Sequence, residues 1–460
     1  MMNRTIAAIA TAVSPSGVGI IRVSGDDAFT VIKRIFKKKS GHFVFENKEI
    51  ESHVVTHGFI YDDSELIDEV LVLTMKGPHT YTGEDTVEID CHGGVLVMKK
   101  ILETVIKYGA SPAEPGEFSK RAFLNGKMDL SQAESVIDLI NSSNEFAREN
   151  SLKHLSGVVK DKLSKIRAEI LHEIAFIESA LDDPEHYSLD TYPQELRKKV
   201  ELFIKDTNSL LKNADNGRIL KEGIKTVIVG KPNVGKSSFL NALIGEDRAI
   251  VTDVAGTTRD VLTETITFDG ITLNIVDTAG IRDTDDFVEK IGVEKSKEYM
   301  KDADLILFLV DATSTFGKED QEILNLLENK KSIVLLNKID LGQSLSLEQV
   351  MEKVDHKVIS ISAKEQIGLD DFINEVKQLF FHGEVTFNDE VYITGVRQKQ
   401  CLISCYQSLT QVLNSIDQGM PEDFFSIDLM NAYTELGNIT GESVGEDLVN
   451  EIFSKFCMGK

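Results

Sequence analysis

The sequence predicts a multidomain fold: an α+β domain, an all-α helical domain made of two segments, and an α/β domain inserted between those segments. Strand-like and helix-like stretches alternate between residues 220 and 381, as expected of a doubly wound, mostly parallel sheet. On both sides of that stretch, apolar residues recur every three or four positions, which is typical of amphipathic helices. The first 118 residues instead mix short strand-like runs with two helical segments.

Length and composition agree with this organisation. The chain has 460 residues, enough for three domains at roughly 150 residues each. Its 50 Lys and Arg against 75 Asp and Glu give a net charge of −25, so an RNA contact would need a local basic patch or a partner's surface. Four cysteines do not form a disulfide framework in so long a chain, which favours a reducing cytoplasm.

No membrane segment is expected. No uninterrupted apolar run reaches the roughly 18 residues of a spanning helix. The apolar N-terminus is interrupted by Ser14 and Pro15, so it is interpreted as a strand rather than a signal peptide.

The N-terminal domain, residues 1–118, should contain strands and two helices. The strand-like runs are 19–23, 57–61 and 69–74, and the helical ones are 28–36 and 94–108. A basic run follows the first helix: Lys33, Arg34, Lys37, Lys38 and Lys39. A solvated helix end is favoured over an RNA contact for this run.

The helical domain should combine residues 119–219 with residues 382–460. Its periodic apolar positions include Leu130, Ala133, Ile137 and Ile140, and then Ile166, Ile170, Ile174 and Ile177. Asp129 or Ser131 is expected to cap the first of these helices. A further helix from Lys198 should end at the polar stretch 213–217.

The inserted domain, residues 220–381, carries six strand-like runs: 225–229, 262–268, 271–276, 305–310, 333–336 and 358–362. Asp269 and Gly270 between two of them indicate a two-residue hairpin. Helical stretches separate the others, which favours parallel pairing.

A phosphate-binding loop is predicted at Gly230–Ser237, which reads GKPNVGKS. It follows an apolar strand and precedes a helix start, the context in which backbone N–H groups cradle phosphates. Lys236 would reach the β- and γ-phosphate oxygens, and the Ser237 hydroxyl would bind Mg²⁺. The positive end of the helix dipole would favour the same anion.

Further motifs follow in the order that a GTPase needs. A hydroxyl of Thr257 or Thr258 can complete the Mg²⁺ shell, and Asp277–Gly280 can hold a metal-bound water and meet the γ-phosphate. In Asn337–Asp340, the Asp340 carboxylate can accept from the guanine ring N–H and its exocyclic amine together, which adenine cannot offer. Ser362–Lys364 would lie behind the base. Each motif is weak alone, but the ordered set predicts GTP binding and a Ras-like G domain.

Hydrolysis needs a group that orients water, and Ile281 cannot do this where Ras-like enzymes place a glutamine. Either turnover is slow or another side chain acts. The amide oxygen of Asn233, inside the phosphate loop, could hold a monovalent cation, although a simple turn residue after Pro232 is the alternative interpretation.

Motifs along nearly the whole chain resemble one family, the MnmE (TrmE) tRNA-modification GTPases. Besides the GTPase motifs they are Thr5–Thr11, Tyr81–Asp85, Cys91–Gly94, Pro115–Phe118, Arg121–Lys127 and Phe456–Lys460. The family's usual ending is Cys-Ile-Gly-Lys, and Met458 here replaces the isoleucine with little change of volume.

The resemblance implies a potassium-activated GTPase that forms a homodimer and pairs with the flavoprotein MnmG in a heterotetramer or larger complex. Together they would add a carboxymethylaminomethyl or aminomethyl group to the wobble uridine of certain tRNAs. The one-carbon donor would be a 5-formyl- or methylene-tetrahydrofolate. A ribosome- or RNA-assembly GTPase without modification chemistry is the alternative, and a dedicated basic module would favour it. A dimerisation protein with a vestigial GTPase is disfavoured by the intact metal-ligand residues.

The resemblance also implies roles for individual residues. Nucleotide contacts would be Asn233, Val234, Gly235, Lys236, Ser237, Ser238, Thr252, Asp253, Val254, Ala255, Gly256, Thr257, Thr258, Asp277, Thr278, Ala279, Gly280, Asn337, Lys338, Ile339, Asp340, Ser362, Ala363 and Lys364. Potassium would be held by Asn233, Thr252, Val254 and Thr257, and magnesium by Ser237 and Thr258. Catalytic candidates would be Glu289, Lys236, Arg282 and Cys457. Folate contacts would be Arg22, Glu84, Lys127 and Lys460.

Overall fold

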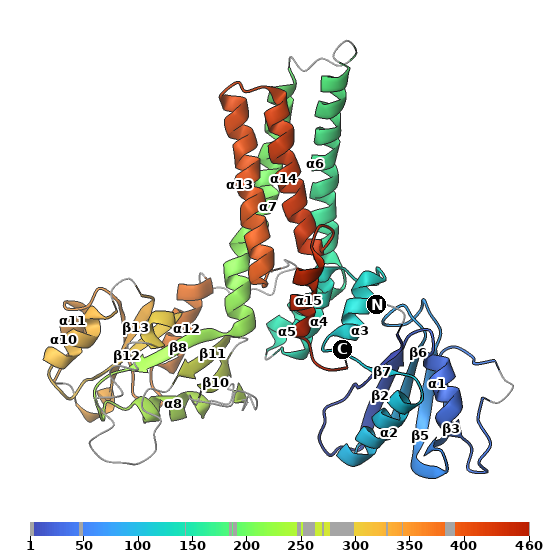
Figure 1. Cartoon of the computed structure of the whole chain (residues 1–460). Helices are drawn as coiled ribbons and strands as arrows, with labels where there is room; N and C mark the ends of the chain where they lie inside the picture. The colour runs from blue at the N-terminus through green and yellow to red at the C-terminus, as the bar shows by residue number, and fades with distance from the viewer. Residues whose placement is uncertain are drawn as a thin grey trace. The chain divides into compact units, whose positions relative to one another are not determined.

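The computed structural model describes most of the chain, in two compact units. The described residues are 4–45, 49–142, 144–183, 186, 191–245, 250–251, 263–268, 271–276, 299–327, 330–342, 344–381 and 392–459. The first unit consists of Met1–Ile140, Leu152–Val200 and Ser404–Lys460, and the second of Asn141–Ser151 and Glu201–Ile403. The helices α5 (Glu145–Leu155), α7 (Tyr192–Glu222) and α13 (Val396–Asp417) contribute residues to both (Figure 1).

The first unit begins with a seven-stranded sheet of order β3-β4-β5-β6-β2-β1-β7. Its strands are β1 (Ile6–Ile9), β2 (Val18–Ser24), β3 (Phe36–Lys37), β4 (Val54–Asp62), β5 (Glu65–Met75), β6 (Thr86–His92) and β7 (Ser111–Pro112). Neighbours are antiparallel except for the β1–β7 pair. Alternate strand residues and the helices α1 (Ala28–Ile35) and α2 (Val95–Lys107) share one core. The α+β prediction for this region is confirmed.

The opposite face of this sheet is not covered by α1 and α2. Val55 and Leu71 are exposed there. Arg22 on β2 lies directly opposite Glu88 on β6 in the strand register. Because side chains alternate between faces along a strand, Arg22 points away from the side on which Ile21 and Val23 are buried.

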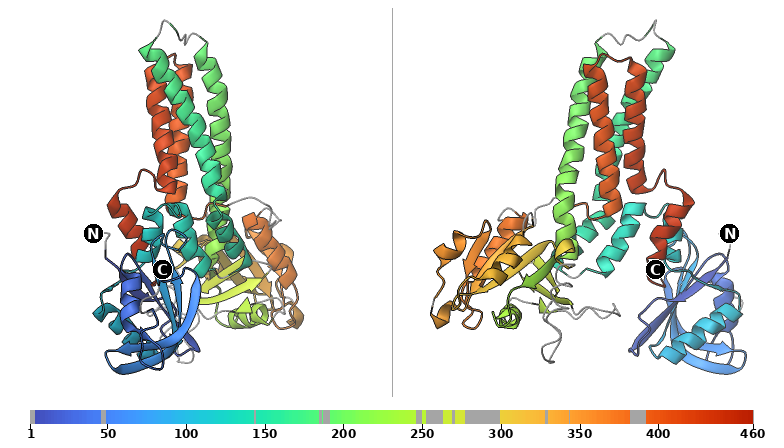
Figure 2. Two further views of the ribbon diagram at one scale, coloured as in Figure 1. Left: turned by 90° about the vertical axis from the view of Figure 1, so that its right-hand side faces the viewer. Right: turned by 60° about the vertical axis from the view of Figure 1, so that its left-hand side comes forward.

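Helices complete the first unit. Besides parts of α5, α7 and α13 they are α3 (Glu117–Leu124), α4 (Leu130–Ile140), α6 (Val158–Asp182), α14 (Glu422–Thr440) and α15 (Glu446–Ser454). The helices α6 and α14 lie side by side (Figures 1 and 2), and the periodic α6 residues Ile166, Ile170 and Ile174 are buried. Asp129 caps α4, because its Oδ1 accepts the Gln132 N–H at 2.9 Å.

The predicted end of the helix at 213–217 is wrong, since α7 continues to Glu222. Ala214 is buried, and a Cβ on Gly217 would lie 2.8 Å from the carbonyl oxygen of Ile393. Close packing therefore outweighs the weak helix propensity of this polar stretch. Gly223, with φ +82°, follows the helix in the left-handed conformation common at helix ends.

The second unit contains a doubly wound sheet of order β14-β13-β12-β8-β11-β10-β9. Its strands are β8 (Ile224–Val229), β9 (Ile250–Val251), β10 (Thr263–Phe268), β11 (Ile271–Val276), β12 (Leu305–Asp311), β13 (Ser332–Asn337) and β14 (Lys357–Ser360). Pairing is parallel from β14 to β11 and antiparallel at β10, so the prediction of a mostly parallel sheet is confirmed. The predicted turn 269–270 lies outside the described residues, although Phe268 pairs with Ile271.

Helices pack on both faces of this sheet. On one face α8 (Lys236–Ile244) and α12 (Leu369–Phe381) bury Phe239 and Phe372. On the other, α10 (Lys318–Asn325) and α11 (Leu347–Met351) bury Leu324 and Val350. A short 3-10 turn, η1 (Ile339–Leu341), follows β13. Across the described helices of the whole chain, none is long and apolar enough to cross a membrane.

Candidate functional site

The phosphate-loop motif lies at the carboxyl end of β8, a central strand with β12 on one side and β11 on the other. Such a position is where ligands bind in open α/β sheets. The helix α8 begins immediately after Gly235, which has φ +97°. A Cβ on Gly235 would lie 2.3 Å from the side-chain nitrogen of Asn337, so only glycine fits. The N–H groups of the first turn of α8 then form an anion site.

Lys236 closes this loop. Its Nζ donates to the carbonyl oxygens of Gly230 at 2.8 Å and Lys231 at 3.0 Å. Phosphate oxygens arriving at the loop can take over these donors, as the P-loop lysine requires. Ser237 and Ser238 are exposed in the same helical turn.

The guanine-binding motif is physically joined to the phosphate loop. The buried Asn337 donates its side-chain amide to the Val234 carbonyl at 2.8 Å and accepts from the Ala363 N–H at 3.0 Å. Lys338 donates to the Asn233 carbonyl at 2.6 Å and pairs with Asp311 at 2.6 Å. The ends of β8, β12 and β13 are therefore held in one arrangement.

Asp311 is ionised in this arrangement. Burial alone would raise the pKa of its carboxyl, but hydrogen bonds from Lys338 and Thr313 outweigh burial and hold the pKa below the ordinary 3.8. Its negative charge can therefore pair with Lys338 at neutral pH.

Asp340 presents a carboxylate beside Ser362. The Ser362 hydroxyl donates to Asp340 Oδ1 at 2.6 Å and accepts from the Glu365 N–H at 3.2 Å. Asp340 itself is exposed. A carboxylate fixed on one side and exposed on the other can accept the paired N–H groups of guanine.

Sequence reasoning missed two supports of the loop, Asp311 and Asp320. Asp320 is buried in the first turn of α10, where it forms an ion pair with Lys231 and accepts from the Gly317 N–H at 2.7 Å. An acidic residue three positions after Gly317 was a visible helix-start signal. Nothing in the pattern connected it with Lys231.

Several predicted residues lie outside the described part of the chain. They are Thr252, Asp253, Val254, Ala255, Gly256, Thr257, Thr258, Asp277, Thr278, Ala279, Gly280, Ile281, Arg282, Glu289 and Lys460.

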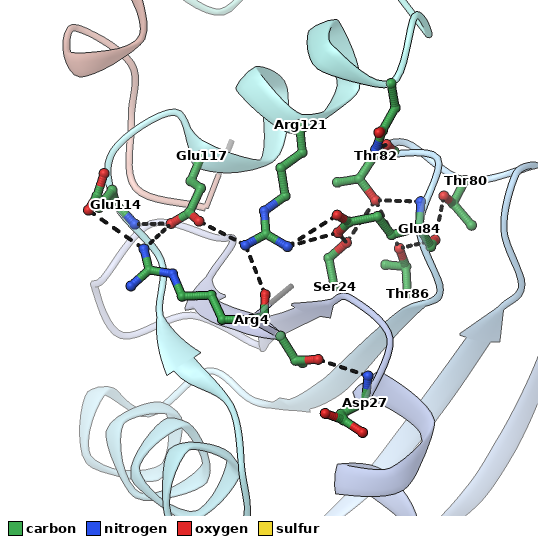
Figure 3. A network of polar contacts seen from close by, with 12 residues as sticks. Arg4, Ser24, Asp27, Thr80, Thr82, Glu84, Thr86, Glu114, Glu117 and Arg121 are labelled. Carbon is green, nitrogen blue, oxygen red and sulfur yellow. Dashed lines mark hydrogen bonds and ion pairs between the residues drawn. The ribbon is translucent and has the colours of Figure 1, made fainter. Parts of the chain in front are cut away.

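A second polar centre lies in the N-terminal domain, around Glu84. Ser24 donates to Glu84 Oε2 at 2.8 Å, and Arg121 Nη1 lies 3.2 Å and 3.0 Å from the two carboxylate oxygens (Figure 3). Thr80 and Thr86 donate to the Glu84 backbone carbonyl at 2.7 Å and 3.1 Å. The carboxylate is therefore held from the strand β2 and from α3, and the backbone that carries it is held by two threonines that neighbour it in the sequence.

Arg121 connects Glu84 with the N-terminus of α3. Its Nη2 donates to the Arg4 carbonyl and to Glu117 Oε1, both at 2.9 Å, and Arg4 pairs with Glu117 at 3.1 Å (Figure 3). Burial would raise the pKa of the Glu117 carboxyl, but the Glu114 N–H, Arg121 and Arg4 together hold it below the ordinary 4.5. Arg121 was not predicted as a site residue, although it begins the motif Arg121–Lys127.

The other predicted folate contacts lie near this centre to different degrees. Arg22 pairs with Glu88 at 2.7 Å and donates to the Gly459 carbonyl at 3.1 Å. Lys127 is exposed and donates to the Pro78 carbonyl at 2.9 Å, in the loop that carries Glu84. Cys457 is an exposed free cysteine.

The phosphate loop lies on the central strand of a doubly wound sheet. It is hydrogen-bonded to the motif that carries Asp340, a carboxylate that suits guanine. This combination defines a GTP-binding protein. Two family models match the chain: the GTP-binding protein TrmE N-terminus over residues 5–127 and the MnmE helical domain over residues 130–457. The second covers more than half of the sequence.

Named relatives match over the full length. A tRNA modification GTPase MnmE of Lachnoclostridium phytofermentans is 53% identical over 460 residues, which is 100% of both chains. One of Clostridioides difficile is 47% identical, again over 100% of both chains. The chain therefore belongs to the MnmE family of tRNA modification GTPases, and it is a GTP hydrolase.

Proposed function

We propose that this chain is a potassium-activated GTPase whose hydrolysis cycle supports wobble-uridine modification of tRNA together with the flavoprotein MnmG. The observation that carries the potassium assignment is the conformation of Asn233. It has φ +61°, a left-handed conformation that asparagine tolerates, and its carbonyl is held by Lys338. Its side chain is exposed on the loop, with an amide oxygen of the type that hard cations prefer.

The proposed ligands fit oxygen-seeking cations. Potassium would take Asn233, Thr252, Val254 and Thr257, and magnesium would take Ser237 and Thr258. When bound, both ions would supply positive charge beside the phosphates. Lys236 would contact the β- and γ-phosphates, and Asp340 would select guanine.

Water activation is assigned to Glu289, since Ile281 has no polar group, and Arg282 is proposed as a functional arginine of the same segment. Glu289→Ala should abolish GTP turnover while GTP affinity stays within about twofold of the parent, because the residue would act on water rather than on the nucleotide. Normal turnover in the variant would refute this role.

The cation proposal is tested by GTP turnover at matched ionic strength in potassium and in sodium. We expect faster turnover in potassium, loss of that stimulation in Asn233→Ala, and retained GTP affinity in the variant. Equal, slow rates of the parent protein in both salts would contradict the potassium assignment.

The modification chemistry is assigned to the N-terminal domain, residues 1–118, with the helical segments 119–219 and 382–460. What supports a folate site there is the fixed carboxylate of Glu84, with the cations Arg22 and Lys127 in the same domain: a pterin edge suits a carboxylate, and an anionic folate tail suits cations. We further propose that the protein acts in the cytoplasm as a homodimer together with MnmG. Cys457 stays a candidate catalytic residue.

Nucleoside analysis of tRNA tests this part. A strain lacking the gene should lose the carboxymethylaminomethyl or aminomethyl group at the wobble uridine, and the intact gene should restore it. Unchanged wobble uridines with defective ribosome assembly would favour the alternative assembly GTPase.

A further inference from the structure

We propose that Asp320, a residue outside every GTPase motif, is a positioning residue for GTP binding. Through its ion pair with Lys231 it holds the first part of the phosphate loop, and with it the resting place of Lys236, in the arrangement that phosphates require. The inference goes beyond the proposed function, because it concerns GTP binding alone and involves neither potassium nor tRNA.

The carboxylate of Asp320 is almost fully enclosed. Its side chain is 4% exposed, and that of Lys231 is 24% exposed. The Lys231 ammonium donates to Asp320 Oδ2, and the same oxygen accepts the Gly317 N–H at 2.7 Å. A carboxylate enclosed to this degree is costly to leave without a cation, because water no longer stabilises its charge. The side chain of Lys231 is therefore held in one direction, toward the start of α10.

The backbone of Lys231 is tied to Lys236. The Lys236 Nζ donates to the carbonyl oxygens of Lys231 at 3.0 Å and Gly230 at 2.8 Å. Gly230 is itself packed closely against β12, since a Cβ there would lie 2.5 Å from the Leu309 carbonyl oxygen. Asp320 holds the side chain of Lys231, and the carbonyl of Lys231 holds Lys236. The buried carboxylate therefore acts on the phosphate-binding lysine through a single residue.

A second lysine–aspartate pair holds the loop further along. Lys338 donates to the Asn233 carbonyl at 2.6 Å and pairs with Asp311 at the end of β12. The two carboxylates of these pairs belong to one segment, residues 311–320, which leads from β12 into the first turn of α10. The phosphate loop is thus held at two points from the same segment. A loop ordered in this way loses less conformational entropy when phosphates bind to it.

Helix capping alone is the simpler interpretation of Asp320. The hydrogen bond from the Gly317 N–H is of the kind that starts a helix, and it needs an acceptor oxygen but no charge. The ion pair with Lys231 does need the charge. Asp320→Asn separates the two roles, because the amide oxygen can still accept from Gly317 while the electrostatic attraction for the lysine is lost.

The test is a double-mutant cycle in the full chain, measured by titration with a fluorescent, non-hydrolysable GTP analogue. Asp320→Asn and Lys231→Met should each weaken binding by about tenfold or more, and the double variant should bind no more weakly than the poorer single variant, because both changes break one interaction. In steady-state turnover the loss should raise KM by a similar factor, with a smaller change in kcat. If Asp320→Asn does not fold, Asp320→Ser, a second uncharged residue suited to a helix start, replaces it in the cycle.

Arg218→Met is the matched control. Asp304, like Asp320, accepts from a backbone N–H, that of Lys225 at 3.1 Å, and pairs with a cation, Arg218 at 2.7 Å. This pair lies at the amino ends of β8 and β12, at the opposite edge of the sheet from the phosphate loop. The variant removes a comparable ion pair from the same unit, so its GTP affinity and KM should stay at the parent values whatever the change in its thermal midpoint.

Three results would overturn the proposal. Parental GTP affinity in Asp320→Asn would leave Asp320 with the helix cap alone. Additive losses in the double variant would show that Lys231 acts independently of Asp320, as a direct contact to phosphate. An equal rise of KM in Arg218→Met would show that any loss of an ion pair in this unit weakens GTP binding, without a particular role for Asp320.

Discussion

The side-chain amide of Asn337 donates to the carbonyl oxygen of Val234, 2.8 Å away. One hydrogen bond thus joins the guanine-binding motif to the phosphate loop across 103 residues of sequence. The same side chain accepts from Ala363, so three motifs share a single buried amide. The two ends of a bound GTP would therefore meet a site that is already assembled.

Asn337→Ala should weaken GTP binding by about thirtyfold or more, because it leaves the Val234 carbonyl and the Ala363 N–H without this partner, at roughly 1–3 kcal/mol for each buried group. Titration with a fluorescent GTP analogue measures the loss. Asn325→Ala, an exposed change on α10, is the control and should bind normally. Equal affinity in the two variants would show that the amide is not needed to assemble the site.

Gly235→Ala should abolish measurable GTP binding. The added Cβ would lie 2.3 Å from the Asn337 nitrogen, at a φ of +97°, so the loop must move away from the position that its partners fix. Gly342→Ala is the matched control, with φ +91° and nothing within 4 Å. It carries only the cost of the left-handed backbone, about 1–2 kcal/mol of stability, and should retain binding. Loss of GTP binding in both variants would show that backbone strain alone abolishes binding, without the contact with Asn337.

Asp340→Asn should change the base preference. The carboxylate that accepts from Ser362 also offers acceptors for the guanine ring N–H and amine. An amide replaces one of these acceptors with a donor, which suits the carbonyl of xanthine. Affinity for GTP should fall by at least about a hundredfold while xanthosine triphosphate gains, as competition binding would show. If the variant keeps its preference for GTP, the guanine base does not bind to Asp340.

Much of the fold was predictable because local patterns decide it. The buried strands of the second unit are continuous apolar runs, such as Leu305–Val310, and the helices of the first unit follow the spacing of residues like Ile166 and Ile170. The phosphate loop was recognisable because its chemistry requires a fixed order of glycines, lysine and serine. These features depend on neighbours in sequence.

The missed contacts depend on tertiary geometry. Lys231 with Asp320, Arg121 with Glu84, and Arg22 with Gly459 join residues that are far apart in the chain, and no periodicity relates them. Arg22 was assigned from resemblance to a folate contact, which stays a prediction, and its hydrogen bond to the Gly459 carbonyl was not foreseen. Which of several plausible partners a charged side chain takes is set by the packing of whole elements.

Arg121→Met should destabilise the N-terminal domain by about 3–5 kcal/mol, since it leaves the largely buried Glu84 carboxylate without its cation and leaves Glu117 with Arg4 alone. The side chain of Arg121 is 7% exposed. The measurement is the denaturant midpoint of the unfolding transition in which β2 and β6 lose their protection from hydrogen exchange. Arg148→Met breaks an exposed pair with Glu145 and should leave the unfolding transitions unchanged. A midpoint like that of the parent in Arg121→Met would mean that the network relaxes or rehydrates.

Acid should destabilise this network through Glu117. Burial raises the pKa of its carboxyl, but the Glu114 N–H, Arg121 and Arg4 together bring the folded-state pKa below the ordinary 4.5. The unfolded chain therefore binds the proton more readily, so the stabilisation is fully present above about pH 4.5 and is lost as pH falls through the lower, folded-state pKa. Glu117→Gln cannot lose a charge, and its stability should depend less on pH below 4.5 than that of the parent, as denaturant unfolding of the N-terminal domain at several pH values would measure. Glu178→Gln, an exposed change on α6, should keep the pH dependence of stability of the parent. If the parent and both variants show the same pH dependence, Glu117 does not contribute to the acid destabilisation.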